Sequence, residues 1–157
     1  MALKVGEKAP DFTAMSDSGS SVTLSGALKD GPVVLYFYPK DETPGCTAEA
    51  CTFRDRWDDI KGLGATVYGV SSDSLESHKR FREKRNLPFT LLSDPDKTVR
   101  KLYGATGAIL PPRITFVIDE EGIIRHVYNS QLNARNHAVE AINALNVIRQ
   151  NRGKSGN

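Results

Sequence analysis

The chain has 157 residues, 39% of them hydrophobic and 25% charged, with a formal net charge of +2. This length and composition suit one globular domain with a real core, and the balanced charge does not indicate nucleic acid or an anionic membrane as a partner. We see neither a signal peptide nor a membrane span, which predicts a cytoplasmic protein, although the mature form of an organelle-imported protein would look the same.

The N-terminal third of the chain predicts a hairpin, a central strand and a helix. Residues 1–30 are rich in Ser, Gly and Asp, which favours a small hairpin and loops. The run PVVLYFYP (32–39) is apolar on both faces, which is typical of a buried central strand, and Pro39 ends it. Thr43 is then expected as a helix N-cap with Pro44 at the first helical position, and the helix should continue to Gly62.

The remaining elements alternate between strand and helix. Predicted strands cover residues 65–71, 89–94, 113–119 and 122–129, and predicted helices cover 74–86, 96–104 and 134–150. The helix at 74–86 should expose a charged face, and the last helix should bury Val139, Ile142, Leu145 and Ile148.

This order of elements predicts an α/β fold of the thioredoxin-like type. We expect a central mixed sheet with a largely parallel core, an antiparallel hairpin, helices on both faces and an added N-terminal hairpin. One domain is expected over residues 1–150, and the polar tail 151–157 should be frayed.

Both cysteines, Cys46 and Cys51, lie in the segment YPKDETPGCTAEAC (38–51). They could be two small core residues, part of a metal site, or a reactive pair. Zinc needs about four ligands, and the three histidines are scattered along the chain, so we expect surface or packing roles for His78, His126 and His137. A thioredoxin-type dithiol would have two residues between its cysteines rather than four.

Cys46 is expected at the third helical position, just beyond the carboxyl end of a central strand. Free N–H groups and the helix dipole stabilise an anion there, and the thiolate is the nucleophilic form of cysteine. A free cysteine, with a pKa near 8.5, is only about 3% thiolate at neutral pH, and a helix terminus supplies at most ~2 kcal/mol. A nearby cation must help, and the candidates are Lys40, Arg54, Arg56 and Arg113.

The spacing of the two cysteines limits their chemistry. On an ideal helix, residues five apart have α-carbons roughly 8.6 Å apart, from the helical rise and radius. A disulfide needs them within about 7 Å. Both cysteines can therefore share an intact helix only as free thiols, and a bond between them requires the first turns to unwind.

At these residues the sequence resembles the peroxiredoxins. Pro39, Thr43 and Cys46 match the family motif around the peroxide-attacking cysteine, and PPRITFVIDEEG is similar to the segment with the family's arginine, here Arg113. Cys51 resembles the resolving cysteine of the PrxQ subgroup, also called bacterioferritin comigratory protein. The segments VGEKAPDF, YGVSSDS, LLSDP and YNSQLNARNHAVEAINAL also fit, so the resemblance covers nearly the whole chain.

The resemblance implies a peroxidase without metal, haem or flavin. Cys46 would attack a hydroperoxide and become a sulfenic acid, which Cys51 would resolve as a disulfide for reduction by thioredoxin. The resemblance also implies supporting roles for Thr43, Arg113 and Glu49. Thr43 would hydrogen-bond the peroxide or the thiolate, Arg113 would stabilise both, and Glu49 would orient Arg113, unless it is only a first-turn acid.

Further roles implied by the resemblance concern the surroundings of the sulfur. Gly45 would allow close approach of the peroxide, and Pro39 would shield the sulfur from water. The subgroup suggests a monomer. Two other hypotheses remain open: a general thiol–disulfide oxidoreductase, and a redox-regulated binding or chaperone-like protein on the same fold.

Overall fold

The computed structural model describes residues 2–107 and 112–155, with side chains as far as residue 151. Its strands are β1 (Thr13–Ser16), β2 (Ser21–Thr23), β3 (Val33–Phe37), β4 (Thr66–Ser71), β5 (Thr90–Ser93), β6 (Ile114–Ile118) and β7 (Ile124–Asn129). Its helices are α1 (Leu24–Leu28), α2 (Pro44–Asp55), α3 (Trp57–Gly62), α4 (Leu75–Arg85), α5 (Thr98–Leu102) and α6 (Asn136–Ser155).

A single mixed sheet forms the centre of the molecule, in the strand order β2-β1-β5-β4-β3-β6-β7. Strands β3, β4 and β5 run parallel, whereas β6 pairs antiparallel with β3 and β7 with β6. The N-terminal hairpin β1–β2 joins the other side through β5. Every residue of β3 is buried, as its continuous apolar run predicts. The thioredoxin-like fold predicted from the sequence is confirmed.

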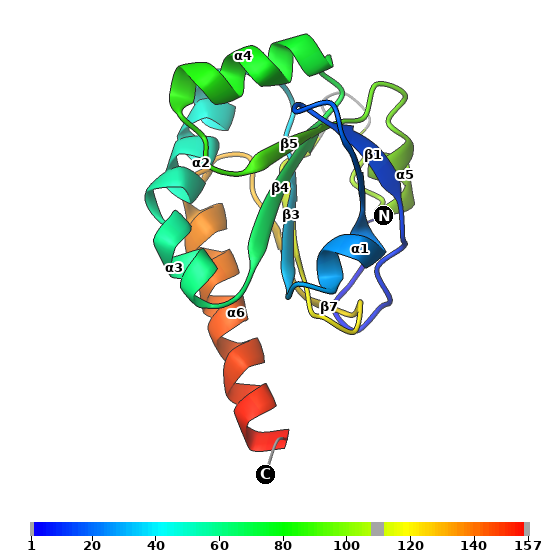
Figure 1. The fold of residues 1–157 in the computed structure, drawn as a ribbon, viewed down its shortest axis with the longest axis vertical. Helices are drawn as coiled ribbons and strands as arrows, with labels where there is room; N and C mark the ends of the chain where they lie inside the picture. Colours follow the sequence, from blue (N-terminus) through cyan, green and yellow to red (C-terminus); the bar gives the residue numbers. More distant parts are fainter. Residues whose placement is uncertain (1, 108–111, 156–157) are drawn as a thin grey trace.

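Helices cover both faces of this sheet (Figure 1). One face packs against apolar residues of α2, α3, α4 and α6, including Phe53, Ile60, Phe81 and Leu145. The other face packs against α1 and α5, including Leu24, Leu28 and Val99. The parallel strands end beneath the start of α2, so the fold brings the cysteine segment to their carboxyl edge.

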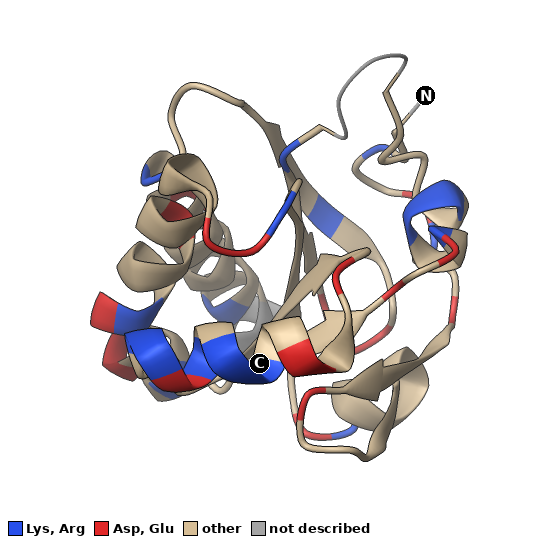
Figure 2. Cartoon of the chain, turned by 90° about the horizontal axis from the view of Figure 1, so that it is seen from above, with Lys and Arg blue, Asp and Glu red and all other residues tan. Residues whose placement is uncertain are grey.

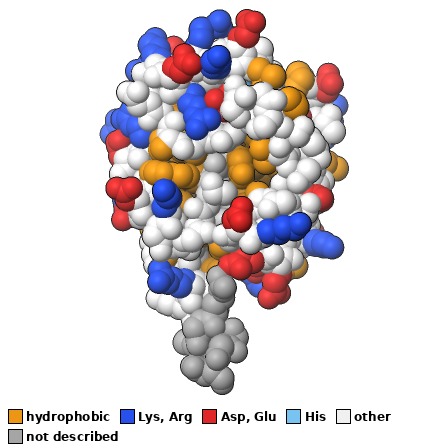
Figure 3. Space-filling view, viewed as in Figure 1, with side chains coloured by type: hydrophobic (Ala, Val, Ile, Leu, Met, Phe, Trp, Pro, Cys, Tyr) orange, Lys and Arg blue, Asp and Glu red, His pale blue; other side chains and the backbone are white. Residues whose placement is uncertain are grey.

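Charged side chains gather on α4, whose predicted polar face is confirmed. Phe81 and His78 face inward, whereas Lys79, Arg80 and Lys84 are exposed. The cartoon of Figure 2 marks Lys and Arg positions in blue along this helix, and Figure 3 shows basic side chains at the same end of the molecule. Asn86 closes the helix in the left-handed conformation, with φ of 53°.

Three local predictions were wrong. The helix expected to continue to Gly62 is interrupted at Arg56, whose φ and ψ of −105° and 14° separate α2 from α3. The last helix, predicted to end at Gln150, continues to Ser155, and residues 156–157 lie outside the described residues. Val139 is 37% exposed, because Ala138 and Ala141 take the buried positions beside Ile142.

None of the described helices is both long enough and apolar enough to cross a bilayer.

Candidate active site

Cys46 is the third residue of α2, and its side chain is almost completely buried. Thr43 precedes the helix in an extended conformation, as expected of an N-cap. Its hydroxyl, however, donates to the carbonyl oxygen of Lys40 at 2.8 Å and makes no hydrogen bond to the helix. The thiol therefore sits among first-turn N–H groups that the Thr43 side chain leaves uncapped.

Arg113 is the cation that reaches this sulfur. It lies just before β6 and is 4% exposed, and its Nη1 donates to Cys46 Sγ at 3.4 Å and to Glu49 Oε1 at 2.6 Å. Burial opposes its charge, but Glu49 and Cys46 outweigh that effect and raise the pKa of Arg113. Arg113 is far from Cys46 in the sequence, and the antiparallel pairing of β6 with β3 brings it beside Cys46.

The three cations near Cys46 in the sequence do not take this role. Arg54 donates to Asp55 and to the carbonyl oxygen of Arg85, and Arg56 donates to Asp59. Lys40 is exposed. The cation that contacts the thiol is therefore the one distant in the sequence, Arg113, and not one of the three nearby.

Gly45 lies against the guanidinium of Arg113. A Cβ atom at this position would be 2.9 Å from Arg113 Nη2, closer than ordinary contacts allow. The absent side chain thus keeps open the space in which the arginine approaches the first turn of α2. Pro39, the other backbone-restricted residue of the segment, is half-buried in the loop between β3 and α2.

Glu49 is not a first-turn acid. It lies in the second turn of α2 and is fully buried, with Oε1 bonded to Arg113. Burial raises the pKa of Glu49 to about 8, although the charge and hydrogen bond of Arg113 act in the opposite direction. Its second oxygen, Oε2, makes no hydrogen bond among the described residues, and it lies 3.4 Å from His137 Nδ1.

Sequence reasoning missed a second buried arginine, Arg100, on α5. Its guanidinium donates to the carbonyl oxygens of Tyr38, Ala105 and Pro112 at 2.7–3.0 Å. Burial lowers the pKa of Arg100, whereas the charges of Asp94 and Cys46 raise it. Arg100 therefore interacts electrostatically with Cys46. In the charged run DKTVRKLYG this residue looks like its exposed neighbours, so no local signal identifies it.

Cys51 lies on the same uninterrupted helix as Cys46 and is partly buried. Both are free thiols, as predicted for two cysteines five residues apart on an intact helix. In this conformation they are not bonded to each other.

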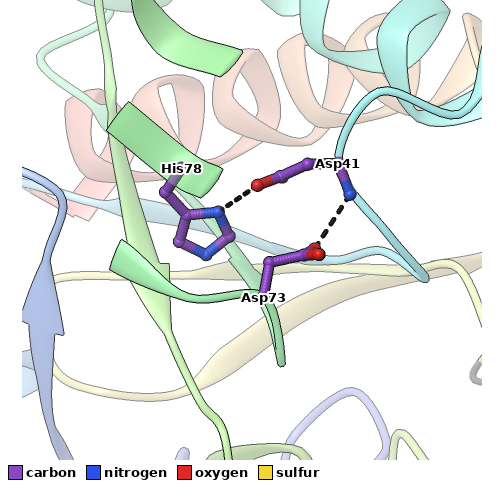
Figure 4. A group of neighbouring side chains, drawn as sticks. All are labelled: Asp41, Asp73 and His78. Carbon is purple, nitrogen blue, oxygen red and sulfur yellow. Dashed lines mark hydrogen bonds and ion pairs between the residues drawn. The ribbon is translucent and has the colours of Figure 1, made fainter. Parts of the chain in front are cut away.

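A group of side chains anchors the loop that leads into α2 (Figure 4). Asp41, Asp73 and His78 are close enough to share a metal ion, but each already has protein partners. Asp41 Oδ2 meets His78 Nδ1 at 2.6 Å and accepts from Ser77, and the backbone N–H of Asp41 donates to Asp73 at 2.8 Å.

The remaining polar atoms of His78 and Asp41 also have hydrogen-bond partners. His78 Nε2 lies 2.9 Å from the carbonyl oxygen of Leu92, and the Tyr38 hydroxyl donates to Asp41. We therefore interpret the group as a hydrogen-bonded anchor of the loop before Cys46. The packing role expected for His78 agrees with this burial.

A groove of about 680 Å³ opens beside the start of α2. Pro44, Gly45 and Ala48 line one side of it, and residues 131–136 line the other. Its mixed polar and apolar walls suit a small molecule that carries both a polar and an organic part.

A buried cysteine at a helix N-terminus beside a buried arginine, on a thioredoxin-like sheet, defines a thiol-based redox protein. The sequence model of the AhpC/TSA family matches residues 5–127, and the chain belongs to this family. Within it, the chain belongs to the peroxiredoxin Q group, also named bcp.

Three similar proteins illustrate this relationship. Chloroplastic peroxiredoxin Q of Oryza sativa subsp. japonica is 46% identical over 89% of the chain, which spans 65% of that relative's length. Peroxidoxin BcpB from Mycobacterium tuberculosis is 37% identical in sequence, and its crystal structure matches with a TM-score of 0.89 over 93% of this chain and 98% of that one.

The third similar protein is a bacterioferritin comigratory protein. The Xanthomonas campestris protein of that name, described for its alkyl peroxide reduction, is 28% identical, with a TM-score of 0.84 over 95% of this chain and 99% of that one.

Proposed function

We propose that this chain is a thiol-dependent peroxidase that reduces hydrogen peroxide and organic hydroperoxides. The observation that carries the proposal is the buried Cys46 sulfur, which receives a hydrogen bond from Arg113 at the N-terminus of α2. Membership of the peroxiredoxin Q group and the alkyl peroxide reduction named for the X. campestris protein support the same substrate class.

In the proposed first step, the Cys46 thiolate attacks the terminal oxygen of the hydroperoxide. The O–O bond breaks, Cys46 becomes a sulfenic acid, and water or an alcohol leaves. Arg113 stabilises the thiolate and the negative charge that develops on the departing oxygen. The groove beside Pro44 and Ala48 accommodates the organic part of the substrate.

Further residues are proposed to orient the peroxide. The Thr43 hydroxyl donates its hydrogen bond to the backbone carbonyl oxygen of Lys40, so its oxygen can accept a hydrogen bond from the peroxide O–H. The backbone N–H groups of Gly45 and Cys46 donate to the peroxide oxygens, and Pro39 limits access of water to the sulfur. Glu49 fixes the orientation of Arg113.

In the proposed second step, Cys51 condenses with the sulfenic acid to form an intramolecular disulfide and release water. Because the two thiols share α2, its first turns must unwind before the sulfur atoms can meet. A thioredoxin-type dithiol then reduces the disulfide. We further propose that the protein works as a single-domain monomer in a reducing compartment such as the cytoplasm.

The second step predicts a distinctive phenotype for Cys51→Ser. This variant should consume about one equivalent of peroxide per chain and then stop as a sulfenic acid, because no second thiol on α2 can condense with it. Stopped-flow peroxide consumption, with thioredoxin, its reductase and NADPH as the regenerating system, measures both phases. Full turnover by this variant would show that Cys51 does not resolve the sulfenic acid.

A general thiol–disulfide oxidoreductase remains the second candidate, because the same fold and a reactive thiol would serve it. The same assay separates the two functions. Rapid reduction of protein disulfides by the wild-type chain, without peroxide consumption, would favour the oxidoreductase.

A further inference from the structure

Arg100 reaches the candidate active site from the other side of the sheet. It belongs to α5, which packs on the face opposite α2 (Figure 1). The residue is 3% exposed, and its guanidinium donates to the carbonyl oxygens of Tyr38, Ala105 and Pro112 at 2.7–3.0 Å. A charged group buried this deeply needs hydrogen-bond partners, and Arg100 finds all three in backbone outside its own helix.

Two of these carbonyl groups belong to the segments that carry the site residues. Tyr38 directly follows β3 and leads into the loop before Cys46, whereas Pro112 directly precedes Arg113. Nη2 of Arg100 donates to the Tyr38 carbonyl at 2.7 Å, and Nη1 donates to the Pro112 carbonyl at 3.0 Å. One planar guanidinium therefore bridges the two segments.

This bridge lies where the pairing of the two strands stops. The last pair between β3 and β6 is Phe37 with Ile114. Tyr38 comes one residue after that pair on the first strand, and Pro112 comes two residues before it on the second. Arg100 thus joins the two segments by hydrogen bonds just beyond the point where the backbone ladder ends.

The surroundings of Arg100 leave its donors to these carbonyl groups. Asp94 is buried nearby, but its two oxygens accept from the backbone N–H groups of Val99 and Arg100 at the start of α5. Cζ of Arg100 lies 5.5 Å from the centre of the Phe37 ring, a cation–π distance. In the part of the chain that the structure describes, the guanidinium therefore bonds to carbonyl oxygens and not to a carboxylate.

We propose that Arg100 is a positioning residue of the peroxidase site, which ties the end of β3 to the segment before Arg113 and so sets the distance between Cys46 and Arg113. This inference rests on the proposed peroxidase function. Cys46 and Arg113 come from separate segments and meet in a hydrogen bond of 3.4 Å. A shift of either segment by about 1 Å would break this bond, and a misplacement of that size can lower a rate by up to ~10²-fold.

Arg100→Met tests the bridge. Methionine keeps an apolar stem but donates no hydrogen bond, so the carbonyl groups of Tyr38 and Pro112 lose their shared partner. We expect the rate constant for peroxide reduction to fall by about 10-fold, and the fraction of Cys46 thiolate at pH 7 to fall with it. Stopped-flow peroxide reduction measures the rate, and ultraviolet absorbance measures the thiolate. Wild-type values of both would overturn the proposal.

These measurements are made in Cys51→Ser protein, so that Cys46 is the sole thiol. The thiolate fraction is determined without peroxide, which separates this inference from the proposed function. If the chain reduces no peroxide, the proposed function fails, but a lower thiolate fraction in Arg100→Met still supports the positioning of Arg113 beside Cys46. An unchanged fraction overturns the inference whatever the activity.

A double-mutant cycle with Arg113→Ala separates positioning from a direct effect of the Arg100 charge. If Arg100 acts by placing Arg113, its removal has little left to disturb once Arg113 is gone. In the Arg113→Ala protein, Arg100→Met should therefore lower the rate by less than about threefold. A further loss as large as that in the wild-type background would show that the two arginines act independently, and would contradict a positioning role.

Arg100→Lys keeps the test decisive if the methionine variant does not fold. Lysine retains the positive charge, but one nitrogen on a flexible stem does not hold the Tyr38 and Pro112 carbonyl groups apart as two guanidinium nitrogens do. The folded variant should lose about threefold in rate and part of its thiolate. A folded lysine variant with the wild-type rate and thiolate fraction would overturn the proposal.

Arg82→Met is the matched control for lost stability. Arg82 also donates to a backbone carbonyl, that of Leu87, and it pairs with Asp17 on the N-terminal hairpin side. This variant should lower the melting temperature but leave the rate and the thiolate fraction unchanged. Equal losses of rate and thiolate in Arg82→Met and Arg100→Met would assign the effect to general destabilisation and overturn the proposal.

Discussion

Replacing Cys46 by serine is expected to abolish peroxide turnover, with a loss of at least roughly 10³-fold in the rate constant. A serine hydroxyl remains protonated at neutral pH even beside Arg113, and an alcohol oxygen cannot be oxidised to the equivalent of a sulfenic acid. Stopped-flow measurement with hydrogen peroxide and an organic hydroperoxide gives the rate directly.

The matched control for this change is Cys51→Ser, which makes the same substitution on the same helix. It should retain the first equivalent of peroxide consumption, whereas Cys46→Ser should consume none. Because Cys46 is buried, the melting temperature of each variant should be compared with that of the wild type. A Cys46→Ser protein that turns over peroxide normally would place the reactive sulfur elsewhere.

Replacing Arg113 by alanine is expected to lower the rate constant for peroxide reduction by about 10²–10³-fold, the effect of removing one charge-stabilising donor from an active site. The guanidinium donates a hydrogen bond to Cys46 Sγ, and in the proposed mechanism its positive charge stabilises the breaking O–O bond. The fraction of thiolate, followed by its ultraviolet absorbance, should also fall at neutral pH. Unchanged thiolate absorbance and rate would remove Arg113 from the site.

Two further variants make the Arg113 result interpretable. Arg113→Lys keeps a positive charge but replaces the rigid, planar guanidinium, whose Nη1 donates to both Cys46 and Glu49, with a flexible ammonium, so its rate should lie between those of alanine and the wild type. Arg54→Ala removes an arginine from α2 that bonds to Asp55 and the backbone of Arg85. It should leave the rate unchanged.

The fold was largely predictable because its signals are local. Continuous apolar runs such as 32–39 can be satisfied only by burial on both faces, and Asn86 closes its helix where the sequence indicates. The interruption at Arg56 has no such signal, since neither Gly nor Pro stands there. Nor does local periodicity reveal that Val139 faces outward while smaller alanines pack against the sheet.

The site residues that belong to a sequence motif were predictable. Those whose role depends on burial in the folded structure were not. Cys46 and Arg113 were expected together, and their atoms lie 3.4 Å apart. Arg100 and His137 are polar residues that each follow or precede an exposed one, Asn136 before His137 and Lys101 after Arg100, so their burial depends on how distant elements pack. Glu49 was expected as a partner of the arginine, but its protonation depends on a depth of burial that no sequence pattern reports.

The contacts on both sides of the cysteine segment limit where α2 can unwind. Asp41 is tied to α4 and to the segment after β4, and Phe53 stacks on Tyr36 with ring centroids 4.7 Å apart, so both flanks of the cysteine segment are pinned. Glu42, between the pinned loop and the helix, has a φ of 67°, which is strained for a residue with a side chain. We therefore expect unwinding of α2 to begin at Glu42 and to stop before Phe53, so that the rest of the sheet and its helices keep their places.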